Sequence, residues 1–337
     1  MNKILSIQTL GFPWQTQDPF LFCAYHRDEY PSGDENMGID RSRLQGRNIG
    51  QDFMIKDGYR MYHGRSIPGF PYHPHRGFET ITINMEGVVD HTDSLGAAGR
   101  FMEGDVQWMT AGRGVQHSEM FPLLHDDKKN SLEIFQIWLN LPKASKMVDP
   151  HFKMLWKEDI PQITHIDTIN KKTIIRIIAG AIRDTKAVPS TPDSWAANPD
   201  NAVGIYTIKM DAHASWTLPS TQSEAHRSIY YYKGAEMRID GQDIPSGQSI
   251  NVVSNEDIDI QNGGQESYML LLEGKPINEP VVQHGPFVMN SQEEIEQTFV
   301  DYQRSKFGGW PWDKAEMVHP RTKGRFALHS DGTEEIK

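Results

Sequence analysis

The sequence predicts an all-β protein built from two tandem β-barrels, with one short helix near the C-terminal end. Short apolar runs separated by turn residues occupy most of the chain. The 28 glycines and 20 prolines among 337 residues suit an architecture with many turns. A pattern of strand, glycine turn and strand occurs over residues 63–141 and again from residue 203. Since no short repeat is exact, the duplication is inferred from architecture alone.

Composition and charge exclude several classes of function. The formal net charge is -11, the pI is about 5.7, and no block is rich in lysine or arginine. Binding to a phosphate backbone needs a concentrated basic surface, so we expect no direct nucleic-acid partner. The single cysteine, Cys23, excludes an intramolecular disulfide and fits a reducing compartment. It lies in an apolar run, and we interpret it as a core residue rather than a reactive thiol.

The apolar stretches are too short for targeting or for crossing a membrane. The first residues reach Gly11 and Pro13 before any long apolar run, which is not the pattern of a signal peptide. The most apolar stretch, residues 174–182, is interrupted by Arg176 and is far shorter than a membrane span. We therefore expect a cytoplasmic protein with no membrane partner.

The first predicted domain covers residues 1–145. Its first clear strand begins after Asp18 and Pro19. Residues 30–62 are polar, glycine-rich and weakly patterned, which predicts a long insertion that leads towards the metal-binding stretch described below. Residues 132–139 are apolar on both alternating faces, which predicts a strand buried on both sides.

The second predicted domain covers residues 146–337. An apolar run at 173–182 is followed by a loop at 188–201 with three prolines, and strands resume at residue 203. Ser291 and Glu294 have the spacing of a capping box, and apolar residues at helical intervals follow them. This helix is expected to stop at Gly308 and Gly309. We expect the tail beyond them to be irregular, with frayed final residues.

Two pairs of candidate metal ligands lie in residues 71–120. Within each pair the two residues are separated by one position, so on a strand they share a face. Strands brought together by the fold would direct three imidazoles and one carboxylate at one point, which predicts a mononuclear metal site. The pairs are His73 with His75 and His117 with Glu119.

The sequence also allows other interpretations of these residues. The two histidines beside Pro74 could be loop residues, with Glu119 a solvated carboxylate. Glu79 is a reserve ligand in place of Glu119, and His91 is a candidate for supporting the ligands. The second half has only His226 at the corresponding place, which predicts a metal-free second barrel.

The donor set narrows the metal. Three imidazoles and a carboxylate suit Fe(II), Mn, Co, Ni, Cu or Zn, and no thiolate is available. In an octahedral site these four ligands leave two positions for water, dioxygen or a chelating substrate. A closed structural zinc site more often uses cysteines. The donors therefore favour chemistry or redox sensing over simple bracing of the fold.

Several motifs are similar to those of the pirin family in the cupin superfamily. They are DPF (18–20), GFPYHPHRGFETIT (69–82), GDVQWMTAGRGVQHSEM (104–120), FQIWLNLP (135–142), MVDP (147–150) and HGPFVMN (284–290). The resemblance implies a bicupin with iron in the first barrel only. It places the iron ligands on His73, His75, His117 and Glu119, and demotes Glu79. This chain departs from the family pattern at residues 30–62, in the long loop 189–201 and in the tail after Phe307.

The resemblance leaves two main functional hypotheses. Some pirin-like proteins are associated with quercetin 2,3-dioxygenase activity, and others with transcriptional co-regulation through protein partners. The first hypothesis is an Fe(II) dioxygenase that acts on a flavonol-like aromatic chelating substrate, with Glu119 as the general base. The alternative is a non-enzymatic redox-sensing module that binds a protein partner through a metal-dependent surface. A third is a metal-braced protein without a redox role.

Overall fold

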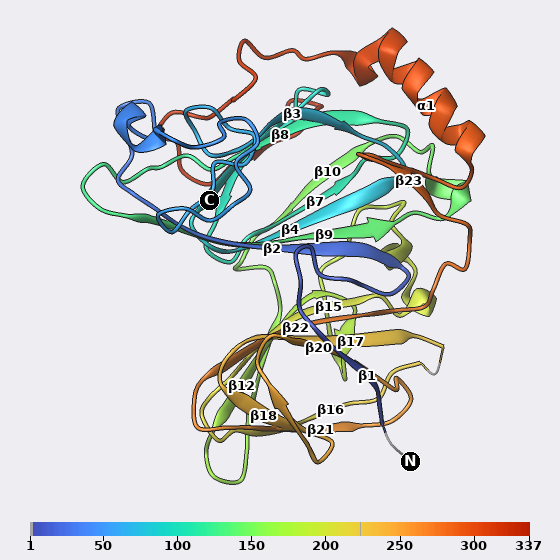
Figure 1. The fold of residues 1–337 in the computed structure, drawn as a ribbon. Helices are drawn as coiled ribbons and strands as arrows, with labels where there is room; N and C mark the ends of the chain where they lie inside the picture. The colour runs from blue at the N-terminus through green and yellow to red at the C-terminus, as the bar shows by residue number, and fades with distance from the viewer. Residues whose placement is uncertain (1–2, 223) are drawn as a thin grey trace. The chain divides into compact units, whose positions relative to one another are not determined.

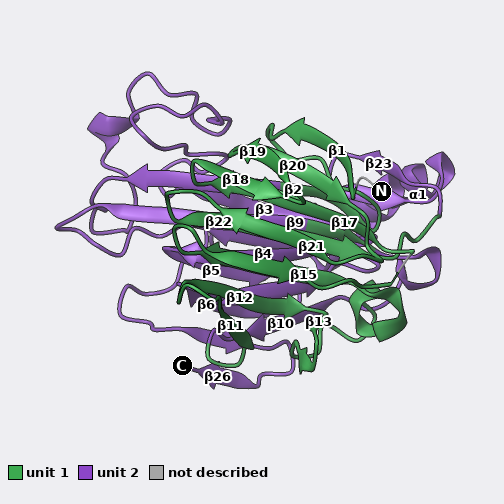
Figure 2. Cartoon of the chain, turned by 90° about the horizontal axis from the view of Figure 1, so that it is seen from below, with its two compact units in different colours: residues 1–23, 138–140, 158–278 green, residues 24–137, 141–157, 279–337 purple. Residues whose placement is uncertain are grey.

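The computed structural model describes residues 3–222 and 224–337, and it is dominated by β-strands (Figure 1). The described chain forms two compact units (Figure 2). We call residues 24–137, 141–157 and 279–337 the first barrel, because they contain the metal-ligand motif. Residues 3–23, 138–140 and 158–278 form the second barrel. No helix among the described residues is long and apolar enough to cross a membrane.

Two sheets build the first barrel. The five-stranded sheet has the order β10 (His151–Leu155), β7 (Val106–Thr110), β4 (Phe78–Glu86), β9 (Asn130–Asn140) and β2 (Phe20–Tyr30). The six-stranded sheet has the order β26 (Glu334–Ile336), β25 (Phe326–Leu328), β6 (Ala98–Met102), β5 (Val88–Asp93), β8 (Val115–Met120) and β3 (Gly69–His75). Strand β9 is buried at most positions on both faces, as its sequence predicts. The predicted metal ligands are expected in the interior between these two sheets.

Two further sheets build the second barrel. The seven-stranded sheet has the order β1 (Ile4–Thr9), β20 (Gln248–Val252), β17 (His226–Lys233), β22 (Ser267–Gly274), β15 (Gly204–Met210), β12 (Lys172–Ala179) and β11 (Gln162–Ile166). The four-stranded sheet has the order β16 (Ser215–Leu218), β21 (Ile258–Asn262), β18 (Glu236–Ile239) and β19 (Gln242–Pro245). Inward residues such as Ile208, Ile229 and Leu271 form one apolar core.

The compact units do not follow the linear division predicted near residue 145. Strand β1 at the N-terminal end pairs with β20 and so belongs to the second barrel. Strand β25 near the C-terminal end pairs with β6 and so belongs to the first barrel. These pairings join residues far apart in sequence, and local patterns carry no signal for them.

The segment between β2 and β3 is largely irregular, as predicted for the insertion at 30–62, with one short 3₁₀ helix, η1 (Arg41–Leu44). Its C-terminal end is fixed to β2 by buried polar groups. Arg60 pairs with Asp28, with its Nε 3.0 Å from Oδ1, and the Tyr62 hydroxyl donates to Asp28 Oδ2 at 2.6 Å. The insertion is therefore an anchored part of the first barrel.

The C-terminal residues follow the helix prediction but only part of the tail prediction. Helix α1 (Gln292–Ser305) begins after Ser291, whose hydroxyl accepts a hydrogen bond from the Glu294 amide, as the capping box requires. Residues 309–325 are irregular, as expected, but the expectation of a frayed end was wrong. Strands β25 and β26 pair with each other, and β25 extends the six-stranded sheet.

A buried ion pair holds this tail. Arg100 and Asp90 are both fully buried, with the Arg100 Nε 2.6 Å from Asp90 Oδ1. The remaining Arg100 donors reach the backbone carbonyls of His319, Pro320 and Lys323. A buried charge pair costs free energy unless its remaining hydrogen-bonding groups have partners. The tail supplies these partners to the Arg100–Asp90 pair of the sheet.

Candidate metal centre

The register of two strands brings the candidate histidines together. Strands β3 and β8 pair antiparallel, with His73 opposite His117 and His75 opposite Val115. Directly opposed residues on one face of a sheet have closely spaced side chains. The pairing is interrupted by an irregularity between Phe70 and His73. The same short strand therefore presents His73 and His75 beside His117.

Three imidazole nitrogens converge at this point. The Nε2 atom of His73 lies 3.1 Å from Nε2 of His75 and 3.1 Å from Nε2 of His117. The ligand atoms of the three residues all lie within 4.8 Å of one another. Within residues 3–222 and 224–337, this is the one such group of three histidine, cysteine or acidic side chains.

Backbone carbonyls fix which nitrogen of two imidazoles carries hydrogen. His73 Nδ1 lies 3.0 Å from the carbonyl oxygen of Pro71, and His75 Nδ1 lies 3.4 Å from that of Pro286. A carbonyl only accepts hydrogen bonds, so Nδ1 is the donor in each ring. The Nε2 atoms then carry free lone pairs, as in metal-binding histidines whose other nitrogen is held by the protein.

Burial keeps the three imidazoles neutral. It lowers the pKa of His73 to about 4 and holds the pKa values of His75 and His117 well below the usual range. The neighbouring histidines lower these pKa values further, because two imidazolium charges in contact would repel. At neutral pH the group therefore presents lone pairs rather than protons.

The arrangement fits a transition-metal ion. The Nε2 lone pairs of His73 and His75 face each other at 3.1 Å, which is repulsive unless a cation lies between them. Two nitrogens bound to one ion at about 2.1 Å and at right angles are about 3 Å apart. Nδ1 of His117 is buried and has no hydrogen-bond partner among the described residues. Neutral imidazoles of this kind suit Fe, Mn, Co, Ni, Cu or Zn.

Glu119 lies beside the histidines and is held from the opposite sheet. Its Oε2 is 3.7 Å from His117 Nε2 and accepts a hydrogen bond from Gln136 Nε2 at 2.6 Å. Its Oε1 accepts one from the Thr82 hydroxyl at 3.0 Å. Burial raises the pKa of this carboxyl group. Glu119 is not within the tight group of three nitrogens, so its role as a fourth ligand stays a prediction.

Glu79, the reserve ligand, is hydrogen-bonded to residues outside the group of histidines. Glu79 is fully buried, and its Oε1 accepts hydrogen bonds from Trp108 Nε1 at 3.1 Å and from the Thr110 hydroxyl at 2.6 Å. Both partners lie on β7, the neighbouring strand in its own sheet. Glu79 therefore fastens β4 to β7.

His91 lies close to the group. It stands opposite Glu119 in the pairing of β5 with β8, and its ring centroid is 5.5 Å from that of His117. Its ring stacks on Phe152 at 4.9 Å. These positions suit a residue that supports the ligands, as the sequence suggests. His226 is exposed, and its Nδ1 bonds the backbone carbonyl of Asp18 in the second barrel.

Aromatic residues border the group, and some come from the insertion. Phe70 lies 6.2 Å from the ring of His73, measured between centroids, and packs against Tyr62 at 5.0 Å. Phe53, which is 40% exposed, lies 6.4 Å from Phe70 and 4.9 Å from His63. The insertion thus reaches the surroundings of the histidines, where sequence position alone suggests it lies.

Three supporting residues were missed from sequence. Thr82 and Gln136 alternate with apolar residues in buried strands, and a polar residue at a buried strand position is the available signal. Pro286 acts through its backbone carbonyl, at the turn between β23 (Val282–His284) and β24 (Phe287–Met289). A contact through a backbone carbonyl, between residues far apart in the sequence, cannot be predicted from the pattern of side chains.

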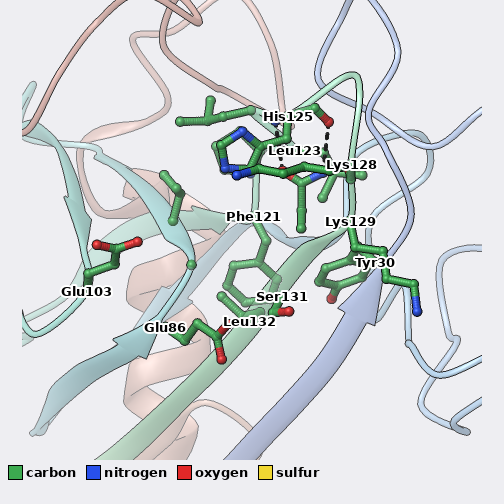
Figure 3. A pocket seen from close by; sticks show the side chains of 15 residues that line it. Tyr30, Glu86, Glu103, Phe121, Leu123, His125, Lys128, Lys129, Ser131 and Leu132 are labelled. Atoms are coloured by element: carbon green, nitrogen blue, oxygen red, sulfur yellow. Dashed lines mark hydrogen bonds between the residues drawn. The ribbon is translucent and has the colours of Figure 1, made fainter.

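A cavity of about 250 Å³ elsewhere in the first barrel is separate from this group. It lies between loop 121–129, the start of β9 and the start of β5, and Figure 3 shows Tyr30, Phe121 and Leu132 around it. None of the three histidines lines it. Its mixed charges, Glu86 and Glu103 with Lys128 and Lys129, are on side chains at its edge. This cavity is therefore not part of the candidate metal centre.

Comparison with known proteins identifies the family. The profile of the pirin family matches residues 39–139, and that of the pirin C-terminal cupin domain matches residues 205–308. The chain belongs to the pirin family. Pirin of Rattus norvegicus is 31% identical over 278 residues, which cover 76% of this chain and 82% of the rat protein. The predicted pirin membership and the predicted fold of two cupin domains are confirmed.

Other members and structures similar to this pirin carry an enzyme name. A protein of Thermoplasma acidophilum, provisionally named a quercetin 2,3-dioxygenase, is 34% identical over 251 residues, 71% of this chain and 92% of that protein. The crystal structure of a quercetin 2,3-dioxygenase from Acinetobacter baumannii matches with a TM-score of 0.71 and 25% identity. That match covers 92% of this chain and 99% of the other.

Proposed function

We propose that this pirin is a mononuclear iron oxidoreductase of the quercetin 2,3-dioxygenase type. Its substrate would be a flavonol-like aromatic molecule that chelates through adjacent oxygens. The observation that carries the proposal is the convergence of three neutral imidazole lone pairs beside a buried carboxylate. The name of the similar protein from Acinetobacter baumannii supports the same reaction class.

The metal would be held by His73, His75 and His117, with Glu119 as the fourth ligand. When bound, Fe(II) supplies a Lewis acid and open positions for substrate oxygens and dioxygen. Carbonyl hydrogen bonds at Nδ1 keep the rings of His73 and His75 oriented towards it. A reducing compartment, as the single buried Cys23 suggests, would keep the iron in the Fe(II) state.

Glu119 is the proposed general base. A carboxylate that loses hydration on burial binds a proton more readily, and burial raises the pKa of Glu119. It would shift from metal ligand to base and accept the proton of the substrate hydroxyl. Thr82 and Gln136 hold the carboxylate in place. Phe70 and the neighbouring aromatic residues would exclude water and stack on a planar substrate.

The test is oxygen consumption by iron-reconstituted protein with quercetin, with His117→Ala as the control. We expect turnover in the wild type and none in the variant, with metal content measured on the same samples. A wild-type protein that holds one iron and consumes no oxygen would overturn the enzyme proposal. Turnover that persists in a metal-free variant would overturn the assignment of the site.

One observation favours the alternative of a redox-sensing regulatory module. His75 Nδ1 contacts Pro286, and the next residue, Arg76, bonds Thr298 and Asp301 of α1. A shift of His75 between Fe(II) and Fe(III) would therefore be transmitted to the surface of α1. This alternative predicts a protein partner that binds one iron state more tightly. Equal pull-down of partners by both iron states, compared by quantitative proteomics, would count against it.

A further inference from the structure

The second barrel contains a cavity of about 580 Å³ that is partly open to solvent, since lining residues such as Lys186 and Ala197 are exposed. The cavity is lined by the end of β12, by β15 and β22, and by residues 186–203. This last segment contains the proline-rich loop 189–201, where the sequence differs from the pattern expected of the family. It contains two short 3₁₀ helices, η3 (Trp195–Ala197) and η4 (Pro199–Asn201). Volumes of this size are typical of small-molecule sites.

Most of the lining is apolar and made of small residues. Alanine, valine and proline side chains come from both the strands and the loop, among them Ala179, Val188, Pro189, Ala197 and Val203. Small side chains leave volume for a ligand, whereas the rest of the barrel interior is filled by large residues such as Ile208 and Leu271. The cavity therefore lies beside the packed core, between the strands and a partly exposed loop.

Two buried polar residues face this volume. Glu273 on β22 and Tyr206 on β15 line the cavity and are 5% and 1% exposed. Each lies two residues from a core residue of its strand, Ile208 or Leu271, and so shares the face that points into the barrel interior. Gly204 provides the space for them, because a Cβ atom there would lie 2.7 Å from Glu273 Cγ and would also overlap the ring of Tyr206.

The charge of Glu273 is balanced by the protein itself. Arg227 on β17 is 2% exposed, and its Nε donates to Glu273 Oε2 at 2.7 Å. The Tyr206 hydroxyl lies 3.1 Å from Glu273 Oε1 and 3.2 Å from the carbonyl oxygen of Ala181. A phenol has one hydrogen and can donate to only one of these acceptors at a time. The site is therefore electrically neutral, and it also keeps one buried donor, Arg227 Nη1, without a hydrogen-bond partner among the described residues.

The carboxylate of Glu273 has capacity for further hydrogen bonds. A carboxylate offers about four acceptor positions. Among the described residues, Glu273 receives hydrogen bonds at two, from Arg227 and from Tyr206, and the second is shared with Ala181. Each oxygen therefore has one partner and can accept one further hydrogen bond. A ligand with a donor group would supply it.

We propose that the second barrel is a binding site for a small neutral molecule with an apolar body and a hydroxyl donor, of the phenol class. Its hydroxyl would donate to Glu273 and accept from Tyr206, and its ring would fill the volume between the strands and loop 187–202. An anionic ligand would face Glu273, and a cationic one would pass Lys186 in the lining, so a neutral molecule is favoured. The site is independent of the metal centre and of the function proposed for it.

The experiment is calorimetric titration of the full-length protein with 4-methylphenol. Toluene, which lacks the hydroxyl, and 4-methylbenzoate, which is anionic, are the comparison probes. We expect 4-methylphenol to bind at least tenfold more tightly than either. Tyr206→Phe should weaken binding about fivefold, which corresponds to one hydrogen bond. Ala197→Phe, which fills the cavity from the loop without touching the ion pair, should abolish it.

Two controls separate this site from the metal centre and from loss of folding. His117→Ala should bind 4-methylphenol as the wild type does, because His117 lies in the first barrel. Each variant should keep the wild-type thermal unfolding midpoint within a few degrees. Absence of 4-methylphenol binding to the wild type, equal binding by Ala197→Phe, or tighter binding of toluene or 4-methylbenzoate would each overturn the proposal. Loss of binding in His117→Ala would place the ligand at the metal centre and overturn it as well.

Discussion

Glu119 in the first barrel and Glu273 in the second are both carboxylates buried between two sheets, but their partners differ. Glu273 faces the guanidinium of Arg227 and the Tyr206 hydroxyl. Glu119 receives hydrogen bonds from the neutral groups of Thr82 and Gln136. The ionisable group beside it, the imidazole of His117, is kept neutral by burial. The second barrel supplies a cation from its own chain, whereas Glu119 in the first barrel is held by neutral donors beside three neutral imidazoles.

This difference explains how one architecture supports two kinds of site. A buried charge requires a counter-charge, which comes from the protein or from a bound ion. Where the strand carries an arginine, the interior is electrically complete and the space beside it accepts a neutral ligand. Where the strand carries histidines, the proposed counter-charge is a bound metal ion. Four substitutions test this comparison.

The largest effect is expected for His117→Ala. Loss of one of three converging imidazoles should reduce bound iron from about one per chain to a negligible amount, because the site needs all three lone pairs. The measurement is metal content after reconstitution and desalting. His226→Ala, an exposed histidine of the second barrel, is the matched control and should bind iron normally. A folded His117→Ala protein with full iron would contradict the comparison.

Arg227→Met should destabilise the second barrel by about 3–5 kcal/mol, because it leaves Glu273 buried without its counter-charge. Urea unfolding of the metal-free protein measures the change. Arg238→Met breaks an exposed arginine–aspartate pair of the same 2.7 Å separation and should cost less than about 1 kcal/mol. Equal effects of the two substitutions would show that burial of the pair is not what matters.

Lys146 offers a pH test of a buried cation in the first barrel. Its Nζ donates to the carbonyl oxygens of Gly77 and Val288 at 2.7 and 3.2 Å, and burial lowers its pKa to about 8. The unfolded chain, with a lysine pKa near 10.5, binds more protons between these values. The free energy of unfolding should therefore rise between about pH 8 and pH 10.5, by about 1–3 kcal/mol.

The check is the difference between wild type and Lys146→Met across this pH range. The rise should vanish in Lys146→Met and persist in Lys209→Met, which removes a half-exposed lysine paired with Glu266. A rise of the same size in all three proteins would assign it to other groups.

The smallest effect is expected for Gln136→Leu. Glu119 loses its 2.6 Å hydrogen bond but keeps that of Thr82, so iron affinity should fall about tenfold with the fold intact. Competition with a chelator measures the affinity. Gln283→Leu, at an exposed position in β23, is the control. Unchanged affinity in Gln136→Leu would mean that Glu119 does not act at the metal.

Much of the fold and of the candidate site follows from local patterns. Alternation and turn residues predict the strands, and Ser291 with Glu294 predicts the start of α1, because each depends on neighbours within a few residues. The spacing of His73 with His75, and of His117 with Glu119, places each pair on one strand face. The family motifs then agree with the profile matches.

Only the tertiary structure decided which distant residues meet. The sequence by itself determined that two barrels form and which side chains are candidate metal ligands. The pairing of β1 with β20 and of β25 with β6, the contact of Pro286 with His75, and the meeting of Arg227 with Glu273 were decided by the packed fold. The physical reason is that these contacts depend on sheet register and loop closure between remote segments, for which no local pattern exists.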